Sequence, residues 1–129
     1  MSQKAIKITG WALTIILALF LAMSALMKIM QNDTAVAQAS SFGIDAAVYR
    51  FIGILEITSL ILFLIPRTGV LGTLLLAAYL GGAIVTHLQH HEPVIMAVIF
   101  QAVLWITAVI RFPELKQRLL LVNSKTIKQ

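Results

Sequence analysis

Two apolar segments separated by one tight turn occupy residues 46–88, AAVYRFIGILEITSLILFLIPRTGVLGTLLLAAYLGGAIVTHL. The first segment covers 46–65, the second covers 68–88, and only Pro66-Arg67 lies between them. A bilayer core about 30 Å thick requires about 20 mostly apolar helical residues, since each backbone polar group must be satisfied within the segment. Because two residues leave room only for a sharp reversal, this stretch predicts a helical hairpin that crosses a membrane twice.

Two further apolar segments flank the hairpin, at residues 8–27 and 93–110. The first is longer than a signal-peptide core of 7–15 residues and has no A-x-A-like site close behind it, so we interpret it as a span. The second begins at Pro93, which a first helical turn tolerates. With 60% apolar and 12% charged residues, the composition is far from that of a globular protein. The predicted fold is an all-α integral membrane protein, an antiparallel bundle of four transmembrane helices that forms a single domain over residues 1–129.

Basic residues are distributed unevenly between the two sides of this predicted bundle. One side has only Lys28 and Arg50. The other side has eight: Lys4, Lys7, Arg67, Arg111, Lys116, Arg118, Lys125 and Lys128. Because cytoplasmic loops carry the excess of Lys and Arg, both termini and the turn at 66–67 are predicted to be cytoplasmic.

The two sides also differ in their connecting segments. The connection 31–45 should face outward, and Asn32-Asp33 as a start and Gly43 as a stop predict a short helix within it. The basic tail, residues 113–129, either lies along the inner leaflet or extends as a solvated tail.

The composition also restricts the chemistry. The chain has no cysteine, which excludes disulfides, thiolate metal sites and iron–sulfur clusters within this chain. The basic residues form no aromatic-interleaved patch, so no nucleic-acid partner is expected. His87, His90, His91 and Glu92 share one short stretch, and no second segment completes a coordination shell, so no metal site is predicted. The sequence shows no known catalytic motif, which leaves open whether the protein is an enzyme.

Three hydrogen-bonding side chains fall at mid-depth in the predicted spans: Glu56, Tyr79 and Gln101. A carboxylate at the membrane centre is opposed by several kcal/mol, so Glu56 should be neutral or paired and should point into the bundle. One interpretation is a binding or proton-handling site; the other is a polar contact that fixes helix register. On the functional interpretation, Glu56→Gln should fold normally and lose function.

A second polar cluster is predicted at the outer ends of the spans. Ser24 and Lys28 end the first span, Arg50 opens the second, and Thr86 and His87 close the third. These residues predict a cationic pocket above Glu56, suited to an anionic head group or a quinone carbonyl. The alternative is that Lys28 and Arg50 extend to the interface as ordinary flanking charges.

Small residues indicate where helices approach closely, since helix packing in lipid depends on small side chains. The third predicted span has Ala77, Ala78, Gly81 and Gly82, and the second has Gly53 one turn before Glu56. We therefore predict that Gly53, Gly81 and Gly82 lie against neighbouring helices.

Five short motifs together resemble the DoxX-like family. They are SALMK at 24–28, RFIGILE at 50–56, IPRT at 65–68, YLGGA at 79–83 and THL at 86–88. The resemblance covers residues 11–113, and Lys28, Arg50, Gly53, Glu56, Thr86 and His87 match the signature positions. Ala25 departs from the pattern, since relatives often have glycine there.

The resemblance implies a four-helix bundle in the bacterial cytoplasmic membrane. The family takes its name from a subunit of a thiosulfate:quinone oxidoreductase, and distant eukaryotic relatives are assembly or trafficking factors. It therefore implies an accessory or anchor subunit of a quinone-linked redox system, with a quinone as ligand and a membrane or peripheral redox protein as partner. A lipid-binding or assembly factor without enzymatic activity is the alternative, and self-association into a homo-oligomer is left open.

Overall fold

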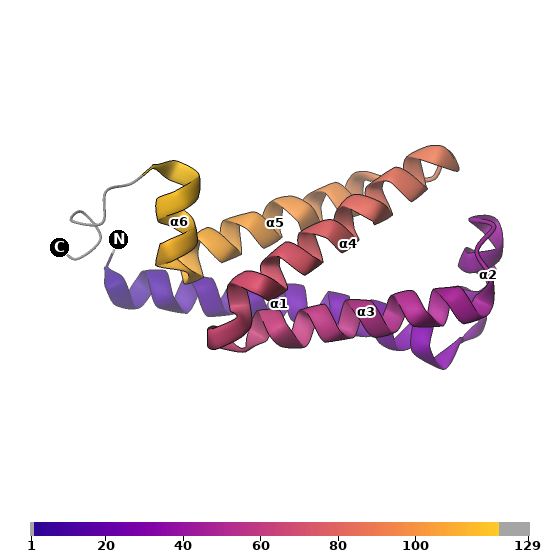
Figure 1. Ribbon diagram of the computed structural model, residues 1–129, viewed down its shortest axis with the longest axis horizontal. Coiled ribbons are helices and arrows are strands. Elements are labelled where there is room, and N and C mark those ends of the chain that lie inside the picture. The colour runs from indigo at the N-terminus through magenta and orange to yellow at the C-terminus, as the bar shows by residue number, and fades with distance from the viewer. Residues whose placement is uncertain (1, 122–129) are drawn as a thin grey trace.

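A computed structural model describes residues 2–121 of the chain, and this part is helical apart from its connections (Figure 1). The elements in chain order are α1 (Gln3–Met30), α2 (Asp33–Ser41), α3 (Ala46–Leu64), the short 3-10 helix η1 (Pro66–Thr68), α4 (Gly69–Gln89), α5 (Ile95–Arg111) and α6 (Pro113–Leu120). The predicted tail includes residues 122–129, which lie outside the described residues.

Within the described residues, three stretches are long and apolar enough to cross a membrane by themselves: α1, α3, and η1 with α4. The pair α5 and α6, bent by 112°, adds a fourth if it is counted as one span. All four apolar segments predicted from the sequence are therefore helical. Helix α1 exceeds the predicted segment 8–27 at both ends, and its 28 residues correspond to a length of about 42 Å.

The connection between α1 and α3 contains the predicted short helix, α2. The Asn32 side chain caps it by accepting a hydrogen bond from the Ala35 backbone N–H at 2.8 Å. After the helix ends, Gly43 adopts a positive φ of 68°, a conformation that glycine reaches without steric cost. Both the start and the stop predicted from the sequence are confirmed.

Two prolines mark the ends of α5: Pro93 precedes the helix, and Pro113 follows it at the bend to α6. Helix α5 begins at Ile95, two residues after the predicted start, so Pro93 lies in the connection. At the other end Phe112 is extended (φ −116°, ψ 97°), because the ring of Pro113 disfavours helical geometry at the preceding residue. Pro113 then opens α6 as its first residue. The direction of α6 therefore differs from that of α5 by 112°.

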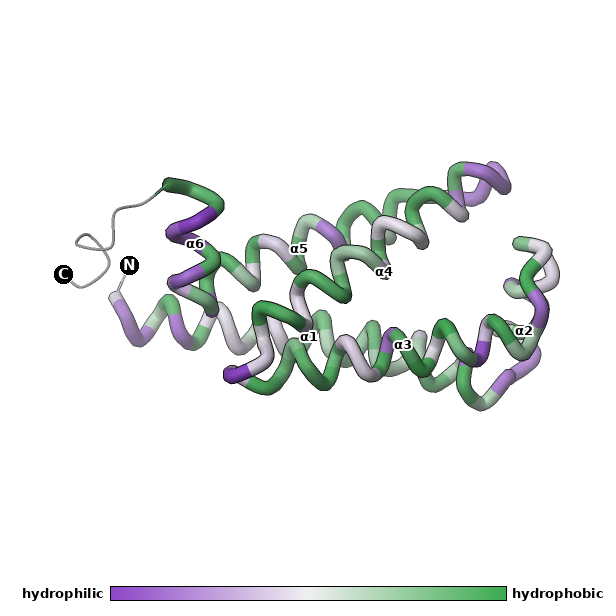
Figure 2. Tube along the Cα trace, viewed as in Figure 1, coloured by the Kyte–Doolittle hydropathy of each residue, from purple (hydrophilic) through white to green (hydrophobic). Residues whose placement is uncertain are grey.

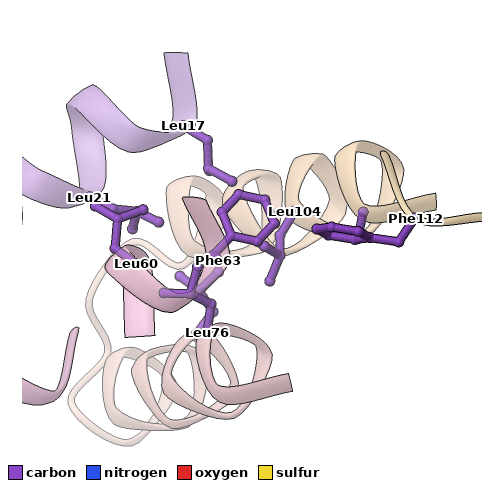
Figure 3. Packing of buried hydrophobic residues seen from close by; sticks show 9 residues of the cluster. Leu17, Leu21, Leu60, Phe63, Leu76, Leu104 and Phe112 are labelled. Carbon is purple, nitrogen blue, oxygen red and sulfur yellow. The ribbon is translucent and has the colours of Figure 1, made fainter. Parts of the chain in front are cut away.

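The four long helices pack in a ring in the order α1, α3, α4, α5. Large side chains from all four helices meet in one buried cluster (Figure 3). Leu17, Leu21, Leu60, Phe63, Leu76, Leu80, Leu104, Ala108 and Phe112 form this buried cluster. Two glycines of α4 allow the close packing: a Cβ on Gly72 would collide with the Phe63 backbone, and one on Gly69 with the Phe112 ring.

Apolar side chains also cover the outside of these helices (Figure 2). Leu19, Met30 and Ile95 are exposed by 66%, 75% and 68%. A water-soluble monomer rarely exposes contiguous apolar surface of this kind. Hydrophilic residues gather instead at the ends of the helices (Figure 2), as expected of a protein that lies in a lipid bilayer.

Candidate functional site

A cavity of about 590 Å³ lies between the helices in the half of the molecule that carries α2. Leu21 and Leu80 belong both to the buried cluster and to the cavity lining, so the packed core forms its floor. Beyond the core, α3 and α4 diverge toward the end bearing α2 (Figure 1). The cavity therefore lies between the α1/α3 pair and the α4/α5 pair.

The polar centre of this cavity is an ion pair between α1 and α3. Lys28 Nζ donates to Glu56 Oε2 at 2.8 Å, and the two side chains are 9% and 0% exposed. The ammonium also donates to Ser24 Oγ at 2.6 Å and to the Tyr79 hydroxyl at 2.9 Å. All three of its protons are thus used. Four residues of the predicted pocket are brought together here by three helices.

Gly53 brings α1 and α3 close enough for this pairing. A Cβ at Gly53 would lie 2.8 Å from Lys28 Cβ and 2.9 Å from the Ala25 carbonyl oxygen. Gly53 and Glu56 are one turn apart on the same face of α3, so the close approach at the glycine places the Lys28 stem beside the carboxylate. The predicted close packing of Gly53 against another helix agrees with these distances.

Two tyrosine rings flank the ammonium. Lys28 Nζ lies 5.4 Å from the centroid of the Tyr79 ring and 5.6 Å from that of Tyr49, within the range of cation–π attraction. The Tyr49 hydroxyl donates to Gln38 Oε1 of α2. Sequence reasoning missed Tyr49 and Gln38, although Tyr49 is seven residues before Glu56 and therefore shares its helical face.

The lining of the cavity at the C-terminal end of α4 includes Thr86, His87 and Phe42. His87 Nδ1 lies 2.6 Å from the Ala83 carbonyl oxygen, and since that oxygen only accepts, Nδ1 carries the proton. The Phe42 ring packs edge-on against His87, with centroids 5.2 Å apart. The connection after α2 therefore touches the end of α4 beside the cavity. No sequence pattern indicated Phe42, because this contact depends on the path of the connection.

Small residues of α4 line one wall of the cavity, and here the packing prediction is wrong. A Cβ on Gly81 or Gly82 would meet nothing within 4 Å. Gly82 lines the cavity beside Ala78 and Ala83. No other helix packs against the small side chains of this wall, because α3 and α4 have already diverged at the level of Gly81 and Gly82. The space beside the wall is therefore open.

Two predicted pocket residues lie elsewhere. Arg50 is exposed and its Nε donates to the Ile29 carbonyl oxygen at the end of α1. It is about 120° from Glu56 around α3, so it does not line the cavity. Gln101 donates to the Ala77 carbonyl oxygen at 3.2 Å and does not line the cavity either. Ala77 and Tyr79 are about 200° apart on α4, which separates Gln101 from the ion pair.

One acceptor of the site has no partner within residues 2–121, the Glu56 oxygen Oε1. A buried polar atom without a hydrogen bond typically costs about 1–3 kcal/mol. The Tyr79 hydroxyl accepts from Lys28, and as a phenol it can also donate. The cavity thus combines a mainly apolar wall with a polar centre that contains one unpartnered acceptor and one hydroxyl able to donate, an arrangement suited to a small molecule with an apolar body and an oxygen-bearing head. Over the same residues, no three His, Asp or Glu side chains are grouped as metal ligands.

Comparison with known proteins gives one finding. A family model described as the DoxX-like family matches residues 12–110. No curated protein matches the chain, and no solved structure does.

Proposed function

The chain belongs to the DoxX-like family, and from that premise we propose that it holds a small amphipathic molecule, an isoprenoid quinone, beside the Lys28–Glu56 ion pair. In this proposal the protein crosses the bacterial cytoplasmic membrane four times as an antiparallel bundle. It acts as an accessory or anchor subunit of a quinone-linked redox system. Because the chain has no cysteine, any thiol-based or iron–sulfur redox group of that system would belong to a separate partner.

The observation that carries the proposal is the buried ion pair next to a cavity. Ionisable residues within apolar spans are costly and usually mark a functional site. A buried ion pair generally adds little stability compared with well-packed apolar residues. Stability alone is thus a weak reason for Lys28 and Glu56 to lie among apolar helices. A ligand that uses the polar centre gives a stronger reason.

A quinone suits the hydrogen-bonding groups of the site. Its carbonyl oxygen would accept a hydrogen bond from the Tyr79 hydroxyl, and in the reduced form its hydroxyl would donate to the unpartnered oxygen of Glu56. The apolar wall of Ala78, Gly82 and Ala83 would accommodate the ring and the start of the isoprenoid chain. Within this site the chain's own residues orient the head group and exclude water from it.

The alternative is a lipid-binding or assembly factor without a redox role. An anionic phospholipid head group would be attracted to Lys28, but Glu56 lies 2.8 Å away and neutralises that charge. The neutral pair therefore favours an uncharged head group over an anionic one.

The proposed orientation follows from the arrangement of charges at the two ends of the bundle. Lys4, Lys7, Arg67 and Arg111 lie at the end formed by the start of α1, η1 and the last turn of α5 (Figure 1). By the excess of basic residues on cytoplasmic segments, this end faces the cytoplasm. Reporter fusions at Gln129 and within α2 are expected to report cytoplasm and exterior, respectively. The reverse result at either site would contradict the four-span arrangement.

Filling the cavity should remove the ligand and leave the fold intact. We expect Gly82→Leu to reduce the amount of small molecule retained after gentle detergent purification at least tenfold, because the leucine side chain occupies the space that the ligand needs. Mass spectrometry of extracted small molecules measures this. The matched control is Gly81→Leu, since Gly81 is the adjacent glycine, also meets nothing within 4 Å and does not line the cavity.

The identity of the retained molecule separates the two candidate functions. An isoprenoid quinone that is lost in Gly82→Leu and kept in Gly81→Leu would support the quinone proposal. A phospholipid, or a co-purifying membrane enzyme without a quinone, would favour the assembly-factor alternative. Equal retention by both variants would show that the ligand is not in this cavity.

A further inference from the structure

A second cavity, of about 860 Å³, lies at the opposite end of the bundle. It is lined by the first turns of α1, the α3–α4 turn and the junction of α5 and α6. These segments lie together at the end that carries the N-terminus and α6 (Figure 1). The site proposed above uses none of them. We call this cavity the basic groove.

Arg111 is held rigidly at the base of the basic groove. Its two terminal nitrogens donate to the carbonyl oxygens of Phe63 and Leu64 at 3.1 and 3.4 Å. The guanidinium carbon lies 4.7 Å from the centroid of the Trp11 ring and 4.8 Å from that of Phe112. Cation–π contacts and hydrogen bonds to backbone carbonyls of this kind fix the position of the charge.

The basic groove carries an excess of positive charge. Lys4 and Lys7 line it from the same face of α1, three residues apart, and both are exposed. Glu114 is the one carboxylate of the lining, so three cations face one anion. Within residues 2–121 the Lys28–Glu56 pair is the one salt bridge. Arg111 therefore has no carboxylate partner in that part of the chain, and no carboxylate there neutralises its charge.

The position of the basic groove matches the head-group level of a membrane. Helix α1 is about 42 Å long and exceeds the apolar core of a bilayer, about 30 Å thick, by about two turns. Lys4 and Lys7, in its first two turns, are therefore placed past the edge of that core. Trp11 lines the groove, and tryptophan is enriched at membrane interfaces. Helix α6 turns away from α5 by 112°, which is the direction of a helix lying in the membrane plane.

We propose that the basic groove binds the phosphate of an anionic phospholipid from the leaflet at this end of the bundle. Lys4, Lys7 and Arg111 supply the positive charge, and basic pockets between spans are known to bind anionic head groups. The exposed apolar side chains of α1, including Ile8, continue from the groove toward the bilayer core and provide a surface for the acyl chains. This site is independent of the cavity at Lys28–Glu56.

The test compares two charge-matched double variants of the full chain in mild detergent. Lys4→Gln with Lys7→Gln removes two charges of the basic groove. Lys116→Gln with Arg118→Gln removes two charges of α6 that do not line it. All four positions are exposed, so thermal midpoints without added lipid should agree. Each protein is titrated with phosphatidylglycerol, phosphatidylcholine or inorganic phosphate, and the rise of the midpoint gives the apparent affinity.

The expected result is selective loss in the first double variant. Phosphatidylglycerol should stabilise the native sequence and the Lys116/Arg118 variant alike, and it should bind the Lys4/Lys7 variant about thirtyfold more weakly, as expected for two basic residues near a head group. If phosphatidylglycerol bound both double variants equally weakly, the loss would reflect general charge attraction, and the proposal would be overturned. Equal stabilisation by phosphatidylcholine would remove the selectivity for anionic lipid, and equal stabilisation by inorganic phosphate would make this a site for free phosphate.

Discussion

Replacement of Lys28 by methionine, or of Glu56 by glutamine, is expected to lower the free energy of unfolding by about 3–5 kcal/mol. Each change removes one partner of a buried ion pair and leaves the other group without compensation. The remaining side chain cannot reach water easily, because the Lys28 and Glu56 side chains are only 9% and 0% exposed. Thermal or denaturant unfolding in a fixed detergent measures the loss. Arg50→Met is the control: it removes an exposed cation outside the pair, and about 1 kcal/mol or less is expected.

The double variant Lys28→Met with Glu56→Leu separates stability from function. Replacing both partners of a buried pair by apolar residues is often neutral or stabilising, so the double variant should recover most of the stability that either single variant loses. It should still fail to retain the small molecule, because the polar centre of the cavity is gone. Additive losses in the double variant would show that the two groups are not coupled. Normal ligand retention would contradict the role of the pair in binding.

This expectation differs from the one based on the sequence, in which Glu56→Gln folds normally. The sequence placed Glu56 in the interior but left its partner open among several residues. The structure places the Lys28 ammonium directly on the carboxylate. A neutral amide keeps the hydrogen bond but removes the compensating charge, so folding and function are no longer separable by that single change.

The second large effect is expected for Gly72→Ala. This substitution should lower the free energy of unfolding by about 1–3 kcal/mol or more. An added Cβ would collide with backbone atoms of Phe63 on α3, and backbone cannot move aside as a flexible side chain can. The α3–α4 hairpin would have to separate at the level of the buried cluster, which is an overpacking change.

The same substitution at two other glycines of α4 supplies the controls for Gly72→Ala. Gly81→Ala and Gly82→Ala place a methyl group where nothing lies within 4 Å, and alanine is favoured over glycine in a helix by about 1 kcal/mol. Both should be neutral or slightly stabilising. Thermal midpoints of the three variants in one detergent test the prediction. Equal midpoints for all three would contradict the close packing of α3 on α4 at Gly72.

Several features of the site could be predicted because they depend on depth along a helix. Lys28, Ser24, Tyr79, Thr86 and His87 all line the same cavity as Glu56. Residue counting from the span ends predicts depth well, since the rise per residue is constant. It does not predict which way a side chain points. Arg50 and Gln101 were placed at suitable depths but lie on other faces of α3 and α5.

The all-helical class, the four apolar helical segments and the short helix at 33–41 were determined by the sequence alone. These features depend on local composition, capping and chain breaks, which act within a few residues. The tertiary structure decided the rotation of each helix about its axis: it paired Lys28 with Glu56, placed Gly72 against Phe63 and left Gly82 facing a cavity. In a water-soluble helix the apolar face would reveal that rotation. Here lipid and core are both apolar, so Leu55 is exposed and Leu60 is buried on the same helix, and hydropathy does not distinguish the two faces.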